Sequence, residues 1–113
     1  MVKSITNAEH YTWGDNCDGW HLLKSDTLSV IQERMPPRTM EKRHFHKVAQ
    51  QVFYILEGTA SFEIEGEVYS LEAHQSIHVP AGKAHCISNQ TTTDLCFIVI
   101  SEPKSQGDRN EIE

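Results

Sequence analysis

Three histidines and one glutamine stand at spacings that suit a metal site. His44 and His46 are separated by one residue, and side chains two apart on a strand point to the same face, so both imidazoles can approach one point. Gln51 opens the next apolar run and offers an amide oxygen, and His85 could close the site from a third strand. Three imidazoles and one oxygen suit Zn²⁺, Ni²⁺, Fe²⁺, Co²⁺ or Mn²⁺. We therefore predict one divalent transition metal as the cofactor, with four ligands: His44, His46, Gln51 and His85.

A further histidine is a candidate for proton transfer beside such a metal. His78 lies two residues before Pro80, and an imidazole titrates close to neutral pH, so it could act as a catalytic acid or base. The strand pattern leaves open whether His78 faces the cavity, and the alternative is a structural role. The substrate pocket is expected to have an apolar wall, made by Phe53, Ile55 and Phe62, with Met40 also lining it.

Short runs of strand-forming residues, separated by turn residues, fill the middle of the chain. Pro36-Pro37 stops the first run, and Glu65-Gly66-Glu67 predicts a hairpin. No amphipathic helix of ten residues is visible. The pattern therefore predicts an all-β fold, a small antiparallel barrel. The runs are residues 27–35, 39–46, 51–56, 60–64, 68–71, 75–79, 84–89 and 94–101.

The two ends of the chain look different from this middle. Residues 1–26 are rich in turn formers around Trp13 and Trp20, and we expect them to be irregular and to cover the barrel. Residues 102–113 form a polar tail that should fray, although Asp108-Arg109 could dock locally. We predict a single domain, residues 1–113, with its core at about residues 27–101.

Composition disfavours several classes of partner. With 10 basic and 16 acidic residues the formal net charge is −6, which argues against a nucleic-acid partner. No apolar run has the length of a membrane helix and no leader-like segment opens the chain, so no membrane partner is expected. The three cysteines are irregularly spaced, which predicts reduced thiols in a cytoplasmic protein.

Two motifs resemble those of the cupin superfamily. The first runs from His44-x-His46 over four residues to Gln51, and over six more to Gly58. The second is Pro80-x-Gly82-x-x-His85-x-x-x-Asn89. The resemblance implies a single cupin domain, folded as a double-stranded β-helix or jelly-roll barrel of two antiparallel sheets, and it implies the same four metal ligands.

The chain departs from that pattern at three positions. Arg38 and His74 stand where the motifs have glycine, so the turns there could differ while the strands survive. Gln51 replaces the usual carboxylate, which leaves the ligand set neutral and the bound ion a stronger Lewis acid. A neutral set also makes oxidation of Fe²⁺ less favourable.

We therefore favour an isomerase or lyase acting on a small oxygenated metabolite such as a sugar acid. The alternatives are an Fe(II) dioxygenase and a non-catalytic small-ligand binding protein. The spacing is also similar to that of small cupins that convert unsaturated uronic acids. In that subfamily an acidic residue is expected within the last core strand, but residues 95–101 contain none and Glu102 lies only at the end of the strand.

The strand at residues 51–56 also predicts how the protein assembles. Val52, Tyr54 and Leu56 share the face opposite Gln51, which makes the outer face of this strand apolar. The N-terminal segment or a second copy must cover it. We predict a homodimer, which the cupin resemblance also implies.

Overall fold

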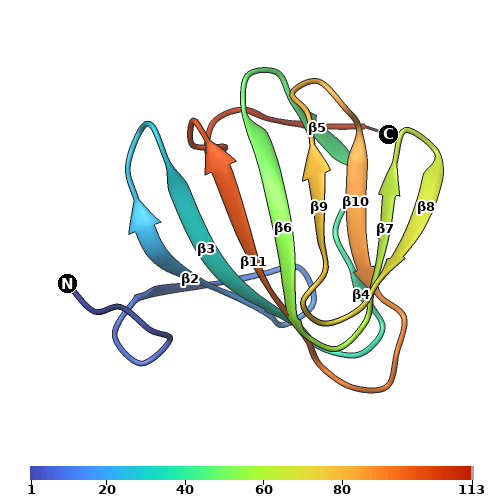
Figure 1. The fold of residues 1–113 in the computed structure, drawn as a ribbon, viewed down its shortest axis with the longest axis horizontal. Coiled ribbons are helices and arrows are strands. Elements are labelled where there is room, and N and C mark those ends of the chain that lie inside the picture. The colour runs from blue at the N-terminus through green and yellow to red at the C-terminus, as the bar shows by residue number, and fades with distance from the viewer. Residues whose placement is uncertain (113) are drawn as a thin grey trace.

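The structure is a computed structural model that describes residues 1–112, and within this range the chain forms strands and no helix. Two antiparallel sheets enclose the core, with the strand orders β1-β2-β3-β11-β6-β9 and β12-β5-β10-β7-β8, and β4 pairs with β10 (Figure 1). The expected all-β fold of two antiparallel sheets is confirmed. None of the described residues form a helix that could span a bilayer. The strands are β1 (Glu9–Trp13), β2 (Cys17–Lys24), β3 (Ser29–Met35), β4 (Thr39–Met40), β5 (His44–His46), β6 (Gln50–Glu57), β7 (Ala60–Ile64), β8 (Glu67–Leu71), β9 (Ser76–Val79), β10 (His85–Asn89), β11 (Leu95–Glu102) and β12 (Arg109–Glu111).

Alternation along the central strands places the core between the sheets. On β6, Phe53 and Ile55 are buried while Tyr54 between them is exposed. The Phe53 ring lies 4.9 Å from that of Phe62 on β7 and 5.8 Å from that of Phe97 on β11. Burial of each such side chain contributes roughly 1.5–3 kcal/mol. A slip of one residue would turn these rings to solvent, so the core fixes the strand register and thereby the direction of every candidate ligand.

The predicted runs in residues 27–101 correspond to β3 through β11. The run at residues 39–46 is split into β4 and β5 by three residues without strand pairing. The predicted hairpin joins β7 to β8, where Glu65 has a φ of 49° and Gly66 a φ of 90°. A two-residue loop with both φ values positive matches the twist of the flanking strands.

The two turns that lack the motif glycine nevertheless keep a left-handed backbone. Arg38 has a φ of 59° and His74 a φ of 70°, a conformation that costs a side-chain-bearing residue about 1–2 kcal/mol. Gly58 is retained, and a Cβ there would lie 2.6 Å from the carbonyl oxygen of Asp94. The turns therefore have the conformation that glycine favours, and the strands that they connect are undisturbed.

The ends of the chain are more regular than the sequence predicts. Residues 1–26 were expected to be irregular, but β1 and β2 form a hairpin that extends the first sheet beyond β3. The tail was expected to fray, but β12 pairs with β5, with Arg109 opposite His46. The possible docking of Asp108-Arg109 is the part of that expectation that the structure confirms. The tail therefore lies beside two of the histidines.

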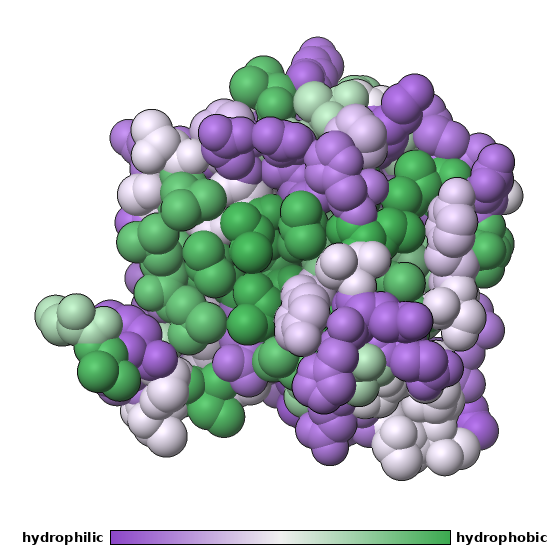
Figure 2. Space-filling view, viewed as in Figure 1, coloured by the Kyte–Doolittle hydropathy of each residue, from purple (hydrophilic) through white to green (hydrophobic). Residues whose placement is uncertain are grey.

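The outer face of the first sheet is apolar. Figure 2 shows a continuous hydrophobic area over β2, β3, β11 and β6. Ile100 and Tyr54 are each 37% exposed and Leu23 is 43% exposed. Strand pairing places Val30 and Val52 on either side of Ile100. The β1–β2 hairpin continues the sheet sideways and leaves this area open to solvent in the single chain.

Candidate metal centre

Three buried histidines converge from two neighbouring strands of the second sheet. His44 and His46 lie at the two ends of β5, and His85 opens β10 directly opposite His44. Their potential ligand nitrogens all lie within 4.8 Å of one another. The ring of His85 stacks on that of Phe62 at 5.9 Å, so the hydrophobic core forms the floor beneath the cluster. The structure thus brings together the three histidines that the sequence predicts.

Hydrogen bonds orient all three rings in the same way. In each ring Nδ1 lies within hydrogen-bond distance of a backbone carbonyl oxygen, at 2.8 Å for His44, 3.1 Å for His46 and 2.9 Å for His85. A carbonyl oxygen only accepts, so each Nδ1 carries the proton and each Nε2 has a free lone pair. Nε2 of His46 and of His85 are buried and have no hydrogen-bond partner. Such orphaned acceptors fit a metal ion, which would use these lone pairs. The three carbonyls belong to Lys42, Asp108 and Lys83.

The amide of Gln51 completes this set of donors. Gln51 is buried on β6, and its Nε2 donates to Oγ of Ser101 at 2.9 Å. Its Oε1 is buried without a hydrogen-bond partner. The neighbouring Gln50 is exposed, and its side chain is engaged by Glu102 and His78. Gln51 is therefore the glutamine available to a metal, and three nitrogens with one oxygen fit a divalent transition metal.

Burial keeps the three imidazoles neutral. Desolvation lowers the pKa of His44 to about 3 and that of His85 to about 4, and it also lowers the pKa of His46. The hydrogen bonds to backbone carbonyls act in the opposite direction but do not outweigh burial. The rings are thus in the protonation state that a metal ion requires over the whole physiological pH range.

The other predicted site residues divide into those near the cavity and those elsewhere. Phe53 and Met40 line the cavity. Ile55 and Phe62 do not, because both are fully buried in the core. His78 lies outside as well: it is exposed, pairs with Val52 on the outer face and lies 3.0 Å from Oε1 of Gln50. The expected proton transfer by His78 is therefore not supported.

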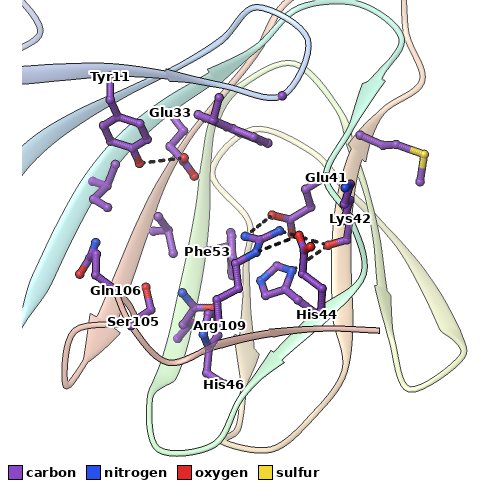
Figure 3. Close-up of a pocket in the computed structure, with 18 of the residues that line it drawn as sticks. Tyr11, Glu33, Glu41, Lys42, His44, His46, Phe53, Ser105, Gln106 and Arg109 are labelled. Carbon is purple, nitrogen blue, oxygen red and sulfur yellow. Dashed lines mark hydrogen bonds and ion pairs between the residues drawn. The ribbon is translucent and has the colours of Figure 1, made fainter. Parts of the chain in front are cut away.

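The cavity above the histidines contains polar residues that the sequence analysis missed. It has a volume of about 730 Å³ and lies between the two sheets (Figure 3). Tyr11, Glu33, Glu41 and Arg109 all line it. Glu33 could have been found from sequence, since it alternates in phase with the apolar residues Ile31 and Met35 and so points inward.

Burial perturbs two of the carboxyl groups that line the cavity. Desolvation raises the pKa of Glu33 to about 7, although a hydrogen bond from Tyr11 partly offsets it. Desolvation, reinforced by the nearby Glu33, raises the pKa of Glu41 to about 8. Groups with such pKa values can exchange protons near neutral pH.

The tail that carries β12 also positions a metal-ligand candidate. The carboxylate of Asp108 accepts hydrogen bonds from the backbone amides of Lys47, Val48 and Ala49 at 2.9–3.0 Å. Its backbone carbonyl is the acceptor for Nδ1 of His46. The next residue, Arg109, extends toward the cavity, where it lies 3.9 Å from a carboxylate oxygen of Glu41 (Figure 3).

Comparison with known proteins points to the same family as the two sequence motifs. Residues 31–101 match the sequence model of the family described as the cupin domain. A mannose-1-phosphate guanylyltransferase from Salmonella montevideo is 37% identical over 90 residues, which are 77% of this chain and 18% of that protein. This chain thus spans less than a fifth of that relative.

Two further proteins are similar over most of their length. An oxalate-binding protein from Thermotoga maritima is 28% identical over 85 residues, 71% of this chain and 70% of that protein. The structure of KdgF from Halomonas sp. superposes with a TM-score of 0.83 at 15% identity, covering 92% of this chain and 95% of the other. At this identity the likeness shows the fold alone.

Proposed function

The chain belongs to the cupin domain family, and from this premise we propose that it is a metal-dependent enzyme of the isomerase or lyase type. Its substrate would be a small oxygenated metabolite such as a sugar acid. The observation that carries the proposal is the set of three buried acceptor atoms without partners: Nε2 of His46, Nε2 of His85 and Oε1 of Gln51. Together with His44 they provide three nitrogens and one oxygen for one divalent ion.

When bound, the ion supplies a Lewis acid that polarises a carbonyl or hydroxyl oxygen of the substrate. The chain itself supplies the groups that hold or move protons. Glu41 and Glu33 both line the cavity, and their pKa values of about 8 and about 7 suit proton exchange near neutral pH. They take the role that the sequence had suggested for His78.

The size and lining of the cavity support a small polar substrate. A volume of about 730 Å³ is within the range of small-molecule sites, and Phe53 gives it an apolar wall. Arg109 also lines it and lies 3.9 Å from a carboxylate oxygen of Glu41, so the lining has charged groups that suit a polar ligand. The relative named an oxalate-binding protein supports a small oxygen-rich ligand. We place the protein in the cytoplasm, because the cysteines Cys17, Cys86 and Cys96 are free thiols.

Metal content tests the proposal directly. Elemental mass spectrometry on untagged protein should find about one equivalent of divalent metal in the wild type and a large loss in His46→Ala. His78→Ala is the matched control, since it removes an exposed histidine on the outer face of the first sheet and should leave the metal content unchanged. Wild-type protein that takes up no metal, even after it is added back, would contradict the proposal.

The identity of the metal and the fate of the ligand separate the alternatives. Zinc or nickel, together with turnover of a sugar acid, supports the isomerase or lyase. Iron with substrate-dependent oxygen uptake would instead indicate a dioxygenase. Binding of a small acid without turnover would indicate a ligand-binding protein, a reading that the name of the Thermotoga relative favours.

The assembly that we propose is a homodimer formed through the apolar outer face of the first sheet. The area over β2, β3, β11 and β6 is continuous, and its exposed members include Ile100, Tyr54 and Leu23 (Figure 2). An exposed apolar area of this kind is typical of an interface. A second copy of the chain would cover it.

A further inference from the structure

Three adjacent strands form an unusual contact at one wall of the cavity. In the strand pairing Tyr11 of β1 lies opposite Gly19 of β2, and Gly19 lies opposite Glu33 of β3. A side chain at Gly19 would stand between the other two. A Cβ built there would collide with the ring of Tyr11, so the ring occupies the space that glycine leaves free.

Because Gly19 has no side chain, Tyr11 reaches across β2 to Glu33. Its hydroxyl donates a hydrogen bond to Oε2 of Glu33 at 3.2 Å (Figure 3). The ring of Tyr11 also packs against that of His21, with centroids 5.1 Å apart. The position of the hydroxyl is thus fixed by packing on both sides. Tyr11 lies outside residues 31–101, the part that matches the cupin domain family, whereas Glu33 lies within it.

The pair faces the histidine cluster across the cavity. Glu33 belongs to the first sheet, whereas His44 belongs to the second, and both line the same cavity with Phe53 between them (Figure 3). Within residues 1–112, Tyr11 is the one hydrogen-bond donor to the Glu33 carboxylate. A carboxylate has about four lone-pair sites, so most of its accepting capacity remains for a ligand.

We propose that Glu33, held by Tyr11, is the second end of the ligand site and selects ligands that carry hydroxyl groups. This inference rests on the proposed function, in which the histidine cluster binds the other end of the ligand. An ionised Glu33 accepts a hydrogen bond from a hydroxyl but repels a second carboxylate. Glu41 adds another acidic group to the cavity, and Arg109 is already close to it. A hydroxylated monoacid is therefore favoured over a plain diacid of the same length.

The test is calorimetric titration of zinc-loaded protein at pH 8 with D-gluconate and adipate. Both are six-carbon acids, but gluconate has hydroxyls where adipate has a second carboxylate. We expect wild type to bind gluconate more tightly than adipate. Glu33→Gln should weaken gluconate binding by about ten-fold, because it removes a charged acceptor, and should not weaken adipate binding. Tyr11→Phe keeps the ring but frees Glu33, and should weaken gluconate binding several-fold.

Glu9→Gln is the matched control, since Glu9 is an exposed carboxylate on β1 that pairs with Lys24. It should change neither affinity. The inference is overturned if wild type does not bind gluconate, if it binds adipate equally well, or if Glu33→Gln binds gluconate as wild type does.

Zinc content measured before each titration separates this result from the proposed function. If wild type holds no zinc, the proposed function fails. The titrations are then run on metal-free protein. The same ratio of gluconate affinities between wild type and Glu33→Gln is expected there, and equal affinities overturn the inference.

Discussion

At the scale of the residue, Gln51 would decide the charge of the proposed centre. As a ligand it would add a neutral oxygen to three neutral imidazoles, so no protein ligand would offset the charge of the ion. Its Nε2 donates to Ser101, which leaves Oε1 without a partner in a cavity that His44 and His46 also line. Ion affinity is therefore expected to depend strongly on this one side chain.

Gln51→Glu should hold the metal more tightly. A carboxylate at this buried position adds attraction for the ion, and we expect at least a ten-fold lower Kd in competition with a chromogenic chelator. The metal-free variant should be less stable than wild type, because the new charge is buried without its partner. Gln50→Glu is the control, since that side chain lies on the outer face. Equal affinity in all three proteins would exclude Gln51 as a ligand.

Glu33 should make stability depend on pH. Its pKa is 4.5 in the unfolded chain and about 7 in the folded protein. Between these values the folded state holds a proton that the unfolded state has released, so raising the pH favours unfolding. In metal-free protein Glu33→Gln should match wild type near pH 5 and exceed its free energy of unfolding by about 1 kcal/mol at pH 8, since the carboxyl is only partly shielded from water. Urea denaturation at several pH values measures this, and a difference independent of pH would contradict it.

At the scale of the element, β12 holds β5 in place. The three hydrogen bonds to the Asp108 carboxylate fasten the β5–β6 turn, and the carbonyl of the same residue orients His46. Burial raises the pKa of Asp108, but the three backbone amides outweigh it and lower the pKa overall. One residue of the tail thus links the stability of a turn to the geometry of the histidine cluster.

Asp108→Asn should lower both the stability of the folded protein and its affinity for the metal. One carboxylate oxygen becomes an amide nitrogen, which cannot accept a hydrogen bond, so we expect a loss of about 1–3 kcal/mol in the free energy of unfolding, measured by urea denaturation. Metal affinity should fall as well, because the carbonyl acceptor of His46 shifts. Asp26→Asn removes an 88% exposed carboxylate that also pairs with the tail, through Lys104, and should have little effect on either. Metal affinity unchanged in Asp108→Asn would show that the tail does not position His46.

Strands whose hydrophobic pattern arises from burial can be predicted from the sequence. Strands that are held in place by contacts with residues distant in the sequence cannot. The central strands β6, β7 and β11 alternate because one face packs on the core, so their positions could be predicted. β12 has three polar residues and no pattern, and its place depends on Asp108 reaching a turn sixty residues away. The direction of His78 could not be predicted either, because it depends on the register of β9 against β6.

The candidate site follows the same division. The histidines and Gln51 could be predicted from the spacing of the two motifs, and the structure brings the histidines together and places Gln51 in the lining of the same cavity. Tyr11 could not, since it reaches the cavity only because the residue opposite it is Gly19. Such a contact between three strands leaves no local pattern in the sequence.

At the scale of the whole molecule, the apolar outer face should control assembly. Ile100→Lys places a charge at the centre of the proposed interface, between Val30 and Val52. We expect wild type to sediment as a dimer and the variant as a monomer in analytical ultracentrifugation. Val68→Lys is the control, because Val68 is 69% exposed on β8 of the other sheet. A wild type that stays monomeric at high concentration would contradict the proposed dimer.

Because β11 pairs between β3 and β6, the first sheet cannot be completed until β11 has been synthesised. Both neighbours leave the ribosome long before residues 95–102 do, and until then their facing edges have no partner. The nascent chain must therefore keep two strand edges unpaired, the state in which β proteins are most prone to associate wrongly. β12 follows later still, and only then is His46 fixed by Asp108. Metal loading is thus expected to come after synthesis of the barrel, so a stalled chain lacking β11 and β12 should neither fold nor retain metal.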